Sequence, residues 1–207
     1  VYIENLASHG TNWKLSNEEQ EEYNQILNVD NNGMMGYIEI PKLQCTLPIY
    51  HGTDEGTLQR NIGHLSGSSV PVGGESTHSV LSGHRGLPSA KLFSDLDKLT
   101  EGDQFVLRVL NETLTYEVDQ ILIVLPDEMD SLRIEEGKDQ CTLVTCTPYG
   151  VNSHRLLVRG HRIENGAASD IRVVADAMQI EPVMVAPMLA IPILLVIFLW
   201  VMLRGKR

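Results

Sequence analysis

The chain has 207 residues, which is long enough for one domain with a full hydrophobic core, and 43% of them are apolar, so a folded chain is expected. Its 27 acidic residues outnumber the 16 basic ones and give a net charge of −11, while aromatic residues make up only 5%. This balance argues against a nucleic acid as a partner, because phosphate binding needs a basic surface and base stacking needs aromatic side chains. Three cysteines are too few for a scaffold held by disulfides.

The N-terminal 34 residues predict an arm followed by a short helix. Residues 1–15 have no clear hydrophobic period and are expected to form an irregular arm. Ser16 and Glu19 have the spacing of a capping box, so a helix should begin there and run to about Asn28. The turn-forming residues 30–33 would end it.

From residue 35 onward, short strand-like segments dominate the sequence. The clearest is the alternation of Leu114, Tyr116 and Val118 with polar residues, which is typical of a strand with one buried face. Strands are predicted at residues 37–40, 46–50, 79–82, 104–110, 113–125, 141–145 and 155–162. Short helical turns are expected only around residues 54–61 and 89–99. We therefore expect a mostly β domain, either a closed antiparallel barrel or a sandwich.

The C-terminal part predicts a membrane anchor. Residues 164–182 have the composition of a linker, and residues 183–203 contain no charged side chain. A helix of about 20 apolar residues spans the ~30 Å hydrocarbon layer of a membrane. The basic tail 204–207 is the kind of flank that stays in the cytoplasm, so the body of the protein is expected outside it. The alternative is a buried core helix.

Cys146 is the most distinctive candidate for chemistry. It follows the apolar strand 141–145 and precedes the turn-rich segment 147–150, a position where a scaffold can hold a nucleophile beside a substrate loop. Arg155 begins the next predicted strand nine residues later, so a hairpin would place it beside Cys146. A guanidinium carries a permanent charge and forked donors, which suit an oxygen that becomes anionic during a reaction.

His84 is the third candidate, at the end of a strand and within the glycine-flanked segment 82–86. An imidazolium near a thiol lowers the thiol pKa and can protonate a leaving amine. Each residue taken alone also has an ordinary interpretation: a buried core cysteine, a structural histidine and a solvated surface arginine. His51, His64 and His78 are interpreted as structural or surface groups.

No cofactor is expected. The sequence has none of the cysteine or histidine pairs with the spacing of zinc ligands, no dense carboxylate loop for calcium, and no phosphate-binding glycine motif. We therefore predict neither a metal nor an organic cofactor.

Taken together, three ordered segments closely resemble sortases, the membrane-anchored cysteine transpeptidases of Gram-positive bacteria. These segments are 82–85, 145–150 and 152–159, and further matches lie at 35–42, 47–53 and 87–93. The branch that the chain resembles most is class C, the pilus-assembling sortases, and the predicted C-terminal membrane helix is also similar to class C. The likeness covers residues 35–163.

The resemblance implies a closed eight-stranded sortase-type β-barrel with short helices. Residues 35–163 would form this catalytic barrel, and residues 1–34 would form an N-terminal helical arm in the region of the family's lid. The linker 164–182, the transmembrane helix 183–203 and the cytoplasmic tail 204–207 would follow. The protein would cross the cell membrane once, with its catalytic domain extracellular.

The resemblance also implies a role for each candidate residue. Cys146 would attack the Thr–Gly bond of an LPxTG-like sorting signal and form a thioester. His84 would be the general acid for the departing amine and then the base for the incoming one, and Arg155 would stabilise the oxyanion or position the signal. The implied partners are pilin subunits or surface proteins with such signals, and the acceptor is a lysine amine of the next pilin. The implied class is a cysteine-type peptidase among the hydrolases.

One departure from class C concerns the lid, which usually carries an Asp-Pro-aromatic motif over the cysteine. This sequence has no Asp-Pro pair, and Asn12 followed by Trp13 stands in the corresponding region. We predict an absent or degenerate lid and an open active site. Cys45 and Cys141 lie inside apolar strands and are expected to be buried thiols rather than a disulfide.

Two alternatives to pilin polymerisation remain open. An anchoring sortase would share the three residues but join surface proteins to the peptidoglycan of the cell wall. A catalytically idle binding module on the cell surface would not need Cys146.

Overall fold

The structure is a computed structural model that describes residues 2–86 and 91–165, which belong to one compact unit, Val1–Asp170. The predicted membrane helix 183–203, the tail 204–207 and almost all of the predicted linker lie outside the described residues. Within the described ranges, no helix combines the length and the apolar character that a membrane crossing requires.

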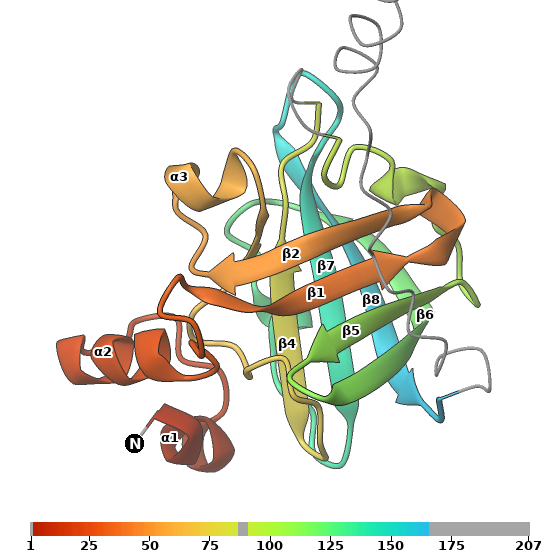
Figure 1. Cartoon of the computed structure of the whole chain (residues 1–207). Helices are drawn as coiled ribbons and strands as arrows, with labels where there is room; N and C mark the ends of the chain where they lie inside the picture. The colour runs from red at the N-terminus through yellow and green to blue at the C-terminus, as the bar shows by residue number, and fades with distance from the viewer. Residues whose placement is uncertain (1, 87–90, 166–207) are drawn as a thin grey trace, which may run out of the picture. The chain divides into compact units, whose positions relative to one another are not determined.

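Eight strands form a closed barrel in the order β1-β2-β3-β4-β7-β8-β6-β5 (Figure 1). Their bounds are β1 Met34–Ile40, β2 Cys45–His51, β3 Ile62–His64, β4 Thr77–Ser82, β5 Gln104–Val109, β6 Glu112–Val124, β7 Asp139–Thr147 and β8 His154–Ile163. The closed barrel is confirmed, but it is not wholly antiparallel, because β2 pairs with β3 and β4 pairs with β7 in parallel. The sandwich alternative is wrong.

Alternation of buried and solvent-facing residues builds the barrel core. Leu114, Tyr116 and Val118 of β6 are buried as predicted, and the ring of Phe105 on β5 stacks on Tyr116 with their centroids 5.5 Å apart. Among the strands that the structure describes, only β3 was not predicted from the sequence. Its three residues, Ile62–His64, are too few to show a period of two.

Short helices connect or flank the strands. They are α1 Tyr2–His9, α2 Asn17–Gln25, α3 Glu55–Leu58 and the 3₁₀ turns η1 Pro41–Leu43, η2 Leu96–Lys98 and η3 Asp130–Leu132. The predicted capping box is present: the Ser16 hydroxyl accepts from the Glu19 amide, and the Glu19 carboxylate accepts from the Ser16 amide. These two bonds fix the beginning of α2.

The expectation of an irregular arm before residue 16 is wrong, because residues 2–9 form α1. Tyr2 and Leu6 lie one helical turn apart and are both buried, so this helix is held by packing rather than by a long amphipathic pattern. The Tyr2 ring packs on Tyr23 of α2 at 5.3 Å, and its hydroxyl donates to the Ser68 carbonyl at 2.8 Å. The N-terminal helices are therefore docked on the side of the barrel.

A buried histidine connects this N-terminal segment to β3. His64 is fully buried, its Nε2 lies 2.8 Å from the Ser69 carbonyl oxygen and its Nδ1 lies 2.9 Å from the Tyr23 hydroxyl. Because a carbonyl can only accept, the neutral ring carries its proton on Nε2 and accepts from Tyr23 at Nδ1. Burial lowers the pKa of His64 to about 4.

The depressed pKa of His64 predicts that acid destabilises the fold. The unfolded chain takes up a proton at this histidine as the pH falls through about 6.5, whereas the folded chain does so only near 4. The contribution of His64 to the free energy of unfolding is therefore nearly complete above pH 6.5. It should fall by roughly 2 kcal/mol between pH 7 and pH 5. Urea unfolding at several pH values measures the loss.

The control for this prediction is His64→Gln, which removes the titrating ring. This variant should be less stable at pH 7 than the original protein, but its stability should depend less on pH. His161→Gln on the exposed surface should retain the pH dependence of the original protein. An unchanged pH dependence in the folded His64→Gln variant would contradict the assignment. Burial also lowers the pKa of His78, so this histidine should likewise reduce the stability of the fold as the pH falls.

Candidate active site

Cys146 and Arg155 face each other across the hairpin of β7 and β8. The two residues are direct partners in the antiparallel register, and Thr147 pairs with His154 next to them. Directly opposed residues of an antiparallel pair have their Cβ atoms about 5 Å apart. The hairpin predicted from the nine-residue spacing is thus confirmed, and Cys146 is half-buried at the end of β7.

The parallel pairing of β4 with β7 brings His84 to the same place. Ser82 pairs with Val144, so the next residues along the chain run beside Thr145 and Cys146. Two hydrogen bonds extend this pairing beyond β4: the Gly83 amide donates to the Val144 carbonyl at 3.0 Å, and the Thr145 hydroxyl donates to the Gly83 carbonyl at 2.8 Å. His84 therefore leaves the strand end beside the cysteine.

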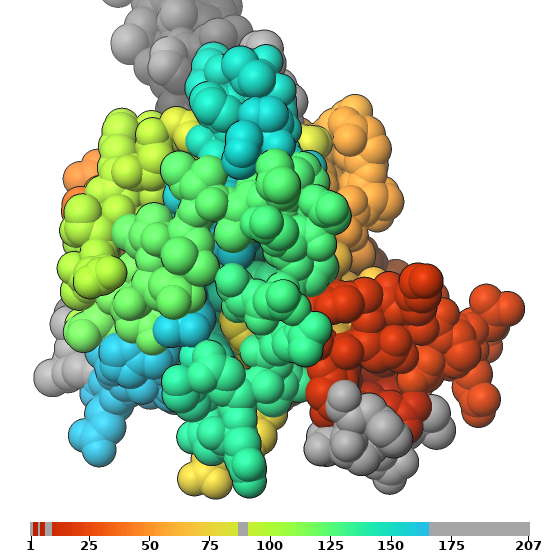
Figure 2. Space-filling view, turned by 180° about the vertical axis from the view of Figure 1, so that it is seen from behind, coloured from red at the N-terminus to blue at the C-terminus, as the bar shows by residue number. Residues whose placement is uncertain are grey.

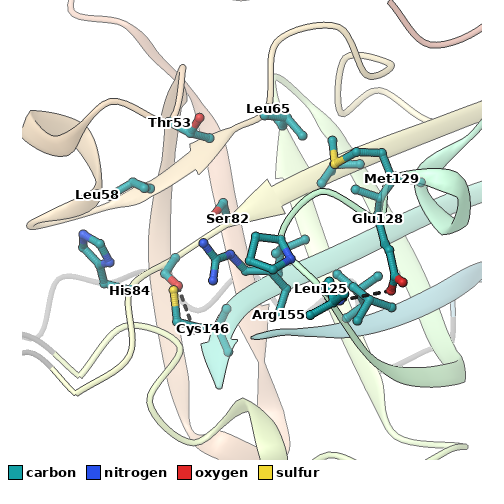
Figure 3. A pocket seen from close by; sticks show the side chains of 18 residues that line it. Thr53, Leu58, Leu65, Ser82, His84, Leu125, Glu128, Met129, Cys146 and Arg155 are labelled. Atoms are coloured by element: carbon teal, nitrogen blue, oxygen red, sulfur yellow. Dashed lines mark hydrogen bonds between the residues drawn. The ribbon is translucent and has the colours of Figure 1, made fainter. Parts of the chain in front are cut away.

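All three predicted residues line one cavity of about 310 Å³, as Figure 3 shows. The rest of its wall is mostly apolar and comes from α3, β4, β6, β7, β8, the residues just after β2 and β3, and the segment between β6 and β7. These apolar lining residues include Leu65, Val80, Val124, Leu125, Met129, Leu132, Val144 and Leu157. A reactive group at one end of an apolar cavity is an arrangement that can hold an extended ligand beside it.

Arg155 is held in place by backbone carbonyls. Its Nη1 donates to the carbonyl oxygens of His154 at 3.0 Å and Asn152 at 3.2 Å. A guanidinium has five N–H donors in a fork, so donors besides these remain available for a ligand oxygen in the cavity. The arginine is therefore oriented by the start of its own strand.

Glu55 is a site residue that the sequence did not indicate. Its carboxylate lies 3.5 Å from Nε2 of His84 and pairs with the imidazole when that ring is protonated. Its side chain is 71% exposed, so solvent weakens the interaction. A helical turn was expected around residues 54–61, and α3 forms there, but nothing in that segment pointed toward His84.

The N-terminal segment supports the cavity without covering it. Trp13 packs against the buried cluster of Val80, Leu132 and Leu157, which belong to the cavity wall. The Asn12 amide donates to the Gly67 carbonyl. Figure 2 shows the N-terminal segment in red, beside the segment between β6 and β7. Among the residues that the structure describes, those that line the cavity begin at Thr53. The open site stays a prediction.

The three cysteines are all free thiols, as expected for Cys45 and Cys141, but the expected burial is confirmed only for Cys141, because Cys45 is partly exposed. Cys141 is fully buried, and burial raises its pKa well above the usual value; burial also raises the pKa of Cys45. In the described ranges, no group of three or more histidine, cysteine or acidic side chains is placed to hold a metal ion.

His51 and His78, which the sequence indicated as structural or surface groups, have structural roles. His78 bonds to the Arg133 carbonyl and the Thr142 hydroxyl in the interior. His51 lies within hydrogen-bond distance of two backbone carbonyls, those of Gly33 and Ile26. These side chains connect neighbouring segments away from the cavity.

Comparisons with known proteins agree with this geometry. The sequence model of the Sortase domain matches residues 38–163. Similar solved structures include sortase C1 from Streptococcus agalactiae, with 59% identity, 80% of this chain and 86% of that chain covered, and a TM-score of 0.78. Another is sortase C-1 from Actinomyces oris, with 51% identity and a TM-score of 0.69. This match covers 72% of this chain and 82% of that chain.

A curated relative is Sortase D of Bacillus subtilis, which is 34% identical over 131 residues. The match covers 62% of this chain and 63% of that relative, so the chain spans less than two thirds of its length.

The open cavity predicts that Cys146 is the thiol that reacts first with a bulky reagent. A fluorescein maleimide should label one site per chain rapidly, because burial raises the pKa of the Cys141 and Cys45 thiols and slows their reaction. Peptide mapping should place the label at Cys146, and Cys146→Ser should lose it. Trp13→Ala should leave the rate within about twofold, since Trp13 does not line the cavity. The prediction would be contradicted if Cys146 reacted slowly and if Trp13→Ala or removal of residues 1–15 made it react faster. That result would show that the site is covered.

Proposed function

The chain belongs to the sortase family, and on this premise we propose that it is a membrane-anchored cysteine transpeptidase that joins pilin subunits. The observation that carries the proposal is the convergence of Cys146, His84 and Arg155 on one apolar cavity. A thiol, an imidazole and a guanidinium around a cleft supply a nucleophile, a proton carrier and an oxyanion partner.

In the first half of the proposed reaction, the Cys146 thiolate attacks the carbonyl carbon of the Thr–Gly bond in an LPxTG-like signal. The carbonyl oxygen becomes anionic and is stabilised by donors of Arg155. When the C–N bond breaks, protonated His84 gives its proton to the departing glycine amine. The products are a thioester between the threonine acyl group and Cys146, and a released peptide.

In the second half, an amine replaces the glycine. The lysine of the next pilin enters as its neutral amine, having left one proton in the solvent. Neutral His84 takes a second proton from this amine as its nitrogen attacks the thioester carbonyl. The C–S bond breaks, the thiolate of Cys146 is restored, and an isopeptide bond joins the two subunits. The general acid of the first half is the base of the second.

The cavity wall supports this substrate class. The leucine and proline of such a signal are apolar, and the cavity offers aliphatic side chains such as Val80, Leu132 and Leu157 beside the cysteine. Pilus sortases among the similar solved structures support pilin as the substrate. One of them, 48% identical over 64% of this chain and 69% of that chain with a TM-score of 0.63, is a pilus-related sortase C of Group B Streptococcus.

The proposal includes an extracellular catalytic domain. The support for it is the uncharged run 183–203 with its basic flank 204–207. Such an anchor would hold the site at the outer face of the membrane, where exported pilins arrive.

Loss of the nucleophile should abolish pilin joining. Pilin subunits expressed with the original protein should form covalent ladders on denaturing gels, and Cys146→Ala should give none, because no thioester can form. Cys141→Ala is the matched control for a thiol that does not line the cavity. Ladders formed with Cys146→Ala would refute catalysis by this cysteine. Pilin monomers bound to the wall without ladders would favour the anchoring alternative, and an inactive original protein would favour the binding module.

Removal of the guanidinium should slow acylation more than it weakens binding. With a fluorogenic LPxTG peptide, Arg155→Ala should lower kcat about 10²- to 10³-fold, since oxyanion donors act mainly in the transition state. The kcat of Arg155→Lys should lie between those of the original protein and Arg155→Ala, because lysine keeps the positive charge but lacks the forked donors of the guanidinium. Arg133→Ala, on an exposed side chain, is the control. A folded Arg155→Ala variant with an unchanged kcat would exclude the oxyanion role.

A further inference from the structure

We infer that Arg85 is a positioning residue that fixes His84 relative to the loop after Cys146, an inference that rests on the proposed function. Arg85 follows His84 directly, and its side chain is only 12% exposed. It makes two contacts with other parts of the chain. One is with Asp97 of η2 and the other is with Tyr149 of the β7–β8 loop.

The contact with Asp97 attaches the His84 segment to the following part of the chain. Nη2 of Arg85 donates to the Asp97 carboxylate at 2.6 Å. Two backbone contacts reinforce it: the Gly86 amide donates to the Ser94 hydroxyl at 3.0 Å, and the Phe93 amide donates to the His84 carbonyl at 3.2 Å. One side of the segment is thereby held against residues 93–97.

The contact with Tyr149 attaches the same segment to the nucleophile's loop. The guanidinium carbon lies 5.9 Å from the centre of the Tyr149 ring, within the range of a cation–π interaction. The ring also rests on Gly86, where a Cβ atom would lie 2.5 Å from Tyr149 Cε2. Gly86 has φ +77°, so it supplies both the backbone conformation and the space for this ring. Tyr149 is only three residues beyond Cys146.

Stability alone does not account for this arrangement. A guanidinium removed from water needs its donors satisfied, yet Nε of Arg85 is buried and has no hydrogen-bond partner among the residues that the structure describes. Asp97 is 47% exposed, so its ion pair with Arg85 is partly screened by solvent. What the arrangement does provide is a bridge between the segment of His84 and the loop of Cys146.

His84 needs such a bridge because its own side chain is weakly held. The imidazole contacts the exposed Glu55 carboxylate at 3.5 Å and lines an open cavity. Its distance from the cysteine is therefore set by the backbone of residues 83–86. Loss of the bridge should misplace the proton carrier, and a displacement of about 1 Å costs on the order of 10²-fold in rate.

The test compares Arg85→Met with Arg108→Met. Arg108 forms a matched, partly buried ion pair with Glu39 at 2.6 Å, in strands β5 and β1 rather than at the cavity, and controls for the loss of such a pair. Arg85→Met should lower kcat on the LPxTG peptide roughly 10- to 100-fold and change KM less than about threefold. Tyr149→Ala should lower kcat by a similar factor. The double variant should lose little more than either single variant, because both changes break the same bridge. Arg85→Lys should recover part of the rate.

A second readout does not depend on activity. The side-chain NMR signal of His84, assigned by its loss in His84→Gln, should move or broaden in Arg85→Met and stay in place in Arg108→Met. This result separates the inference from the proposed function, because it can be obtained even if the original protein cleaves no peptide. A folded Arg85→Met variant with an unchanged His84 signal, or with an unchanged kcat in an active enzyme, would overturn the inference.

Discussion

The register of three neighbouring strands is the constraint on which the site depends. β7 lies between β4 and β8, and it pairs in parallel with the first and antiparallel with the second. Residues on β7 therefore set the position of both neighbours, with Cys146 opposite Arg155 on one side and beside the extension of β4 toward His84 on the other. Because successive residues of a strand point to opposite faces, a slip of one residue would turn a member of this set away from the cavity.

The backbone around His84 is held by packing that only glycine permits. A Cβ atom at Gly83 would lie 2.6 Å from Ile62 Cδ1 and 2.7 Å from Phe93 Cδ2, so any side chain there would force Ile62, Phe93 or the strand end to shift. The Gly83 carbonyl also accepts from Thr145, the residue before the cysteine. The close approach of two strand ends thus links the position of the imidazole to that of the thiol.

The parts of the site that the sequence could indicate are those with local signals. The turn between residues 146 and 155 predicts a hairpin from spacing alone, whereas the approach of His84 depends on a parallel pairing between distant strands and followed only from the resemblance to sortases. β3 and α1 escaped prediction because their form comes from packing: Ile62 lies in the core, and Tyr2 packs on Tyr23. Glu55 escaped because an exposed carboxylate on a four-residue helix carries no pattern.

The charges around the cavity differ in how they are neutralised, and this difference fits their roles. Arg85 is paired with Asp97, and His84 has Glu55 within reach. Arg155 instead bonds to carbonyl oxygens, and in the part of the chain that the structure describes it forms no ion pair with a carboxylate. Neutral carbonyl dipoles orient a guanidinium without cancelling its net charge. Arg155 can therefore present a full positive charge to an oxyanion, in a protein whose overall charge is strongly negative.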